Sequence, residues 1–209
     1  MKGLFLKDCY MMSRYCRAVF FLMIMFLAVS AAEDDNLFFT IYPMMVASII
    51  PTTLLSYDEK SGWNIYSCTL PCSRAQMVSV KYLIAAALIA VVWIIAAAIQ
   101  GIRAAAGVGA AREELAWILS ILLLLGLVSS AVILPVMFKY GVEKGRMAYY
   151  ITIAVVCGSG VAFPQILEKL QISVNVQGNL VPLLLCAAGA IVFGISWMIS
   201  VKVYEKREI

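Results

Sequence analysis

The sequence contains no histidine and few charged residues. Of its 209 residues, 13% are charged and 64% are apolar. Soluble domains contain about 25% charged and roughly 45–50% apolar residues. The absence of histidine also removes the commonest metal ligand and the usual proton-transfer group near neutral pH. This composition excludes a soluble globular enzyme, a disordered tail and a nucleic-acid binder.

Two further absences concern cofactors. The sequence has no Gly-x-x-x-x-Gly-Lys-Ser/Thr motif, so we expect no ATP to bind this chain through a phosphate loop. Cys68 and Cys72 lie four residues apart, but further metal ligands are not nearby. We therefore predict no catalytic, cofactor-binding or metal-binding residue in this chain, and we predict that it is not itself an enzyme.

Six apolar segments are long enough to cross a bilayer, which needs about 20 residues in a helix. They are residues 15–32, 37–57, 82–102, 115–138, 147–167 and 180–201. The first segment also resembles a secretory signal, because a basic leader precedes it and a small-residue stretch ends it. We expect it to be retained, because the leader is long and contains Asp8. The sequence thus predicts one all-α transmembrane domain over residues 1–209.

The positions of lysine and arginine predict the orientation. If six helices cross the membrane and the N-terminus is cytoplasmic, 13 of the 16 basic residues lie inside. Only Arg103, Arg112 and Lys169 then lie outside. Basic residues are enriched in short cytoplasmic loops, so both termini are predicted to be cytoplasmic.

Two cytoplasmic segments accompany the spans. Residues 1–14 mix apolar and basic side chains and predict an interfacial amphipathic helix, although a simple basic flank would look similar. Residues 58–81 form a polar segment, with a short helix expected near Ser61–Ser67 and a break at Leu70-Pro71. Ser73 and Gln76 fit a capping box that begins the next helix.

Trp63 and Tyr66 lie three residues apart and would share one face of the short helix. They could fill a pocket of a partner protein or lie in the aromatic belt of the membrane interface, and the sequence favours neither. From the second span onward, no charged residue interrupts a predicted span. Pumps coupled to protons or sodium usually carry such residues at mid-membrane, so we do not expect a self-powered pump.

Several segments resemble the bacterial type-2 ABC transporter permease family, whose members are small six-span subunits that work beside a separate ATPase. The resemblance covers the N-terminal third of the chain. It rests on Met1–Asp8, Phe39–Pro43, Ser56–Lys60, Trp63, Tyr66, Leu70-Pro71, Arg74 and Lys81-Tyr82.

The resemblance implies a permease in a bacterial plasma membrane, paired with a second permease copy or a paralogue. Cytoplasmic ABC ATPase subunits, which bind ATP and magnesium, would dock beneath it. The resemblance places this docking on residues of the 58–81 coupling segment and its edge: Tyr57, Asp58, Glu59, Lys60, Trp63, Tyr66 and Arg74. It implies export of a peptide or amphipathic compound. The alternatives are a non-transporting membrane assembly or immunity protein and, less favoured, an integral-membrane enzyme.

Overall fold

The computed structural model describes residues 2–32, 38–67, 73–107, 112–145, 147–155 and 180–206. These residues are almost entirely helical and contain no β-strand. The helices are α1 (Lys2–Tyr15), α2 (Arg17–Ala32), α3 (Phe38–Lys60), α4 (Trp63–Ser67), α5 (Arg74–Ala105), α6 (Arg112–Tyr140) and α8 (Leu180–Glu205). Residues 142–145 and 147–155 are also helical.

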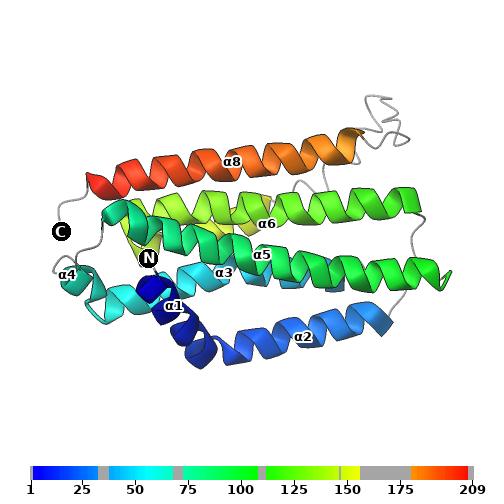
Figure 1. Cartoon of the computed structure of the whole chain (residues 1–209), viewed down its shortest axis with the longest axis horizontal. Coiled ribbons are helices and arrows are strands. Elements are labelled where there is room, and N and C mark those ends of the chain that lie inside the picture. The colour runs from blue at the N-terminus through cyan, green and yellow to red at the C-terminus, as the bar shows by residue number, and fades with distance from the viewer. Residues whose placement is uncertain are drawn as a thin grey trace.

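The long helices α2, α3, α5, α6 and α8 run side by side as a bundle (Figure 1). One end, which we call the proximal end, carries α1, α4, the start of α5 and the last turns of α3, α6 and α8 (Figure 1). The opposite, distal end carries the end of α2 and the starts of α3, α6 and α8. Helix α1 leaves α2 at a bend of 72° (Figure 1).

Four described helices, α3, α5, α6 and α8, are long and apolar enough to cross a membrane. The bent pair α1 and α2 would count as a fifth span if its two parts act together. Helix α2 alone has 16 residues, or about 24 Å, which is shorter than the roughly 30 Å apolar layer. The all-helical membrane fold is therefore confirmed, whereas six spans remain a prediction. The predicted span 147–167 lies partly outside the described residues, and Lys169 lies wholly outside them.

Helix α5 begins where its sequence predicts. The Ser73 hydroxyl accepts a hydrogen bond from the Gln76 backbone N–H, and the Gln76 side chain accepts one from the Ser73 N–H, both at 3.3 Å. This capping box confirms the prediction. The short helix expected near Ser61–Ser67 is corrected to α4, which begins at Trp63. Ser61 and Gly62 form a turn instead, and Gly62 takes a positive φ of 67° that favours glycine. The expected break at Leu70-Pro71 lies outside the described residues.

Close helix contact and hydroxyl groups hold the bundle together. A Cβ on Gly126 of α6 would lie 2.9 Å from the Met44 sulfur of α3, so a larger residue here would have to displace the buried Met44 side chain. The Ser48 hydroxyl of α3 donates to the Gly126 carbonyl at 3.2 Å. Small residues and interhelical hydroxyl bonds are typical of association in lipid, where apolar burial alone gives little preference for a neighbouring helix.

Helix α8 joins the bundle through a group of hydroxyls. The buried Tyr82 hydroxyl of α5 lies 2.8 Å from Ser196 Oγ and 2.7 Å from Ser200 Oγ of α8. Ser196 also donates to the Ala131 carbonyl of α6 at 2.6 Å. These contacts connect three helices at one level and fix the rotation of α8.

A second polar group lies at the distal end. The buried Arg103 of α5 donates from Nη1 to the Ser30 carbonyl, in the last turn of α2. The hydroxyls of Ser30 and Thr40 share a hydrogen bond of 2.7 Å, and Gln100 donates to Thr40 at 3.1 Å. An arginine at a helix C-terminus satisfies carbonyls that lack partners within the helix. Arg103 thus anchors α2 to α5, and Gln100 connects α5 to α3.

Candidate functional site

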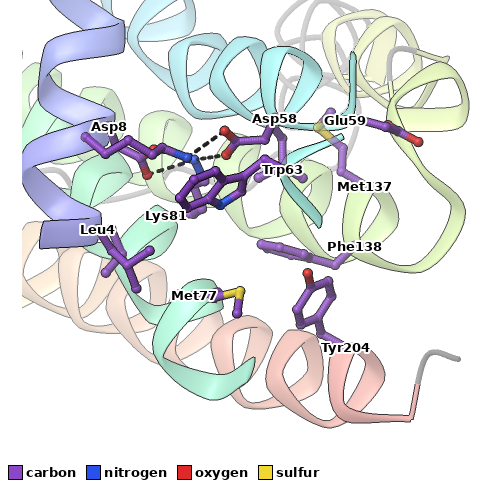
Figure 2. A pocket seen from close by; sticks show the side chains of 13 residues that line it. Leu4, Asp8, Asp58, Glu59, Trp63, Met77, Lys81, Met137, Phe138 and Tyr204 are labelled. Atoms are coloured by element: carbon purple, nitrogen blue, oxygen red, sulfur yellow. Dashed lines mark hydrogen bonds and ion pairs between the residues drawn. The ribbon is translucent and has the colours of Figure 1, made fainter. Parts of the chain in front are cut away.

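Four charged side chains form a closed ring at the proximal end. The Lys7 ammonium lies 2.6 Å from Asp58 and 3.2 Å from Asp8, and the Lys81 ammonium lies 2.6 Å from Asp58 and 2.7 Å from Asp8. Each lysine therefore contacts both aspartates, and each aspartate contacts both lysines. Figure 2 shows Asp8, Asp58 and Lys81 converging from three different helices. The ring connects α1, α3 and α5.

The ring is buried but electrically balanced. The side chains of Asp8, Asp58 and Lys81 are 3%, 6% and 8% exposed, while that of Lys7 is 22% exposed. Removing a charge from water is costly unless opposite charges and hydrogen bonds replace the lost hydration. Here two positive and two negative groups alternate, so no net charge is buried. Loss of one member would leave an uncompensated charge.

Helix α4 is attached to α1 through the same ring. The Lys7 ammonium lies 4.1 Å from the centre of the Trp63 ring, a distance typical of cation–π attraction. The Trp63 and Tyr66 rings also contact one another, with their centres 5.5 Å apart. This contact confirms that the two aromatic side chains share one face. Trp63 is half-buried beside the ring of charged side chains, whereas Tyr66 is 58% exposed.

Glu59 connects α3 to the segment after α6. Its Oε2 accepts a hydrogen bond from the Val142 backbone N–H at 3.0 Å. Gly141, the first residue after α6, has a φ of +85°. A Cβ at this position would lie 3.2 Å from Glu59 Oε1. The positive φ favours glycine at this position, and a Cβ there would require a small shift of the Glu59 carboxylate.

The structure gathers the predicted docking residues at the proximal end but gives them different environments. Tyr57 stacks on Tyr15 of α1 with ring centres 4.4 Å apart. Arg74 donates to the Glu205 carbonyl of α8 at 3.0 Å. Lys60 is exposed, and Asp58 is only 4% exposed within the ring. The docking role of all seven residues remains a prediction.

Sequence reasoning missed the ring itself. Lys7 and Asp8 belong to the basic leader, and Lys81 precedes a predicted span, so each looked like an ordinary flanking charge. The available signal was that charged residues flank three apolar segments: Lys7 and Asp8 precede the first, Asp58 follows the second and Lys81 precedes the third. Sequence spacing does not tell which of those ends meet.

The cavity beside the ring is small. Leu4, Met77, Phe138 and Tyr204 are among the side chains around it (Figure 2). Its volume is about 40 Å³, which is room for a few water molecules at most. The described part of the chain also has no group of three His, Cys, Asp or Glu side chains that could hold a metal ion. The ion pairs of the ring make this end of the chain a junction of α1, α3 and α5.

Comparison with known proteins gives one match. A family described as "ABC-2 family transporter protein" matches residues 3–205. No curated protein and no solved structure matches the chain.

Proposed function

Because the chain belongs to the ABC-2 family of transporter proteins, we propose that it is the membrane-spanning permease subunit of an ATP-binding cassette exporter. The family match over residues 3–205 carries this proposal. A separate cytoplasmic ATPase would bind and hydrolyse ATP. A peptide or another amphipathic compound is the proposed cargo, and a second permease copy or a paralogue would complete the membrane part in a bacterial plasma membrane.

The distribution of basic residues supports a cytoplasmic proximal end. The described long helices carry most of their basic side chains there: Lys60, Arg74, Lys81, Lys139 and Lys202. Arg103 and Arg112 lie at the distal end (Figure 1). Basic residues favour the cytoplasmic side of short loops. With six spans, both termini, α1 and α4 would then face the cytoplasm.

The position of α4 supports docking of an ATPase at this end. It is a short helix between two candidate spans, and the ring and Trp63 attach it to α1, α3 and α5. Force applied to α4 would therefore reach three helices together. Lys60 and Tyr66 expose their side chains and are suited to direct contact, whereas the buried Asp58 would act by positioning α3.

The charge-free centres of the spans support an external energy source. Between Lys81 and Arg103, α5 has no charged residue, and the other described spans carry their charges near their ends. Charged groups at mid-membrane are typical of ion-coupled transport. ATP hydrolysis in a partner would replace that source of energy.

The test is purification of the tagged chain from its native membrane in mild detergent, followed by mass spectrometry. An ABC ATPase in a constant ratio to this chain is the expected result. Tyr66→Ala should reduce the recovered ATPase about tenfold, because exposed aromatic anchors often dominate an interface. Tyr10→Ala, which removes a side chain of similar exposure from α1, is the matched control.

Recovery of the intact chain without an ATPase, under conditions that preserve a known ABC complex, would contradict the proposal. A different membrane partner in constant ratio would then favour a non-transporting assembly or immunity protein. Equal ATPase recovery with Tyr66→Ala and Tyr10→Ala would contradict only the docking role of α4 and would leave the permease proposal standing.

A further inference from the structure

A larger cavity lies on the other side of α3 from the charged ring. It has a volume of about 320 Å³ and is bounded by α3, the end of α6 and the helical residues that follow. Ligand pockets usually measure roughly 300–1,000 Å³, so this cavity can hold a small ligand or part of a larger one. Met137 separates it from the small cavity beside the ring, since it lines both.

The cavity changes character along α3. Lys60 lies at its proximal end, and Ile49 lies 11 residues earlier, or about 16 Å deeper along the helix. Ile49, Met137 and Val142 give apolar walls. A ligand that follows this cavity would have a polar head near the membrane interface and an apolar part directed into the bilayer.

Its polar side chains are one ammonium group and several hydroxyls. Lys60 is exposed and forms no ion pair with another described residue. Tyr57, Tyr149 and Tyr150 contribute phenol groups to the lining. Thr52 and Thr53 donate their hydroxyls to the Ile49 carbonyl, at 2.6 and 3.3 Å, and so add no free donor. An ammonium group with several hydroxyls favours an anion over a cation.

Acidic side chains do not oppose this preference. No carboxylate is among the described residues that line the cavity. The nearest in sequence, that of Glu59, accepts the Val142 N–H and lines the smaller cavity instead. Among the described residues, no carboxylate of the lining competes with a ligand for Lys60.

We propose that this cavity binds an anionic phosphate-bearing amphiphile of the phospholipid class. Its phosphate would lie near the Lys60 ammonium and the tyrosine hydroxyls, and the beginning of an acyl chain would extend along α3 toward Ile49. The volume accommodates a headgroup and part of one chain, with the rest in the bilayer. The inference deepens the proposed function, and binding itself does not depend on an ATPase.

The first test is native mass spectrometry of the full chain in detergent, with equal amounts of dioleoyl-phosphatidylglycerol and dioleoyl-phosphatidylcholine. We expect preferential retention of phosphatidylglycerol. Lys60→Gln should reduce this preference about fivefold, which is the effect of one basic residue on an anionic lipid. Lys206→Gln removes an exposed lysine at the same end but outside the cavity, and should leave the preference unchanged.

A second variant protects the test against misfolding. Tyr149→Phe combined with Tyr150→Phe keeps both rings and removes two hydroxyls, and it should also weaken phosphatidylglycerol retention. Equal retention of the two lipids by the parent chain would overturn the proposal. So would an effect of Lys60→Gln no larger than that of Lys206→Gln.

The second readout distinguishes the sources of the amphiphile. In proteoliposomes with the partner ATPase, we follow fluorescent phosphatidylglycerol in the parent chain and in the Tyr149→Phe/Tyr150→Phe variant, which changes no proposed docking residue. Movement between leaflets that requires ATP and is lost in this variant would identify the lipid as cargo. Lipid that binds selectively without moving would support a resident lipid at the same site. Failure to recover an ATPase would contradict the proposed function while leaving the lipid-binding result intact.

Discussion

Substitution of Asp58 by asparagine should destabilise the junction of α1, α3 and α5. Asp58 accepts from Lys7 and from Lys81, both at 2.6 Å, and it is buried. The variant leaves Asp8 with two lysines, and therefore one uncompensated positive charge. Breaking a buried ion pair costs about 3–5 kcal/mol. Because Lys7 is 22% exposed and can turn toward solvent, we expect Asp58→Asn to lower the free energy of unfolding by ~3 kcal/mol, the low end of this range.

This loss corresponds to a decrease in melting temperature of about 6–12 °C for a chain of this size. The double variant Asp58→Asn with Lys81→Gln leaves Lys7 beside Asp8 and restores neutrality. It should therefore recover at least half of the loss, since residues of one network do not contribute additively. The assay is thermal unfolding of the purified chain in detergent, followed by circular dichroism.

Glu143→Gln is the control, because it removes an exposed carboxylate at the same end. The reasoning would be refuted if the double variant lost as much as the two single variants together. It would also be refuted if Asp58→Asn had the same melting temperature as Glu143→Gln.

Three further predictions concern the packing of the bundle. Gly126→Leu should destabilise the chain by about 1–3 kcal/mol in the same thermal assay, because even its Cβ would press on Met44. Gly101→Ala is the control and should be tolerated, since a Cβ added there meets no other part of the chain within 4 Å. Tyr82→Phe should cost about 1 kcal/mol through loss of the Ser196 and Ser200 contacts, and Tyr10→Phe on an exposed surface should cost almost nothing. Arg103→Gln should loosen the end of α2, which hydrogen–deuterium exchange would detect as faster exchange around Ser30, and unchanged exchange there would contradict the anchoring role.

Local features of the fold could be predicted from the sequence. The capping box depends on two side chains three residues apart, so the start of α5 was predictable. The helical character of α3, α5, α6 and α8 follows from their long apolar runs. The start of α4 was missed by two residues because a short pattern does not show that Gly62 would take a left-handed turn.

Contacts between distant segments could not be predicted in this way. Asp58 lies 51 residues from Lys7 and 23 from Lys81, and a charge beside an apolar run looks the same whether it faces water or a partner charge. Arg103 is a similar case, since the sequence predicts the side of the membrane on which it lies but not its contact with Ser30 of α2. Helix packing determines these environments, and a single sequence does not encode it visibly.

The closed ring also restricts how this chain can change during evolution. A substitution that removes the charge of any one of Lys7, Asp8, Asp58 or Lys81 leaves an excess charge in the ring, whereas exchange of an oppositely charged pair for neutral residues does not. Descendants of this sequence should therefore lose acidic and basic members together. In related chains, covariation among these four positions would mark the ring even where α1 and α5 share little other similarity.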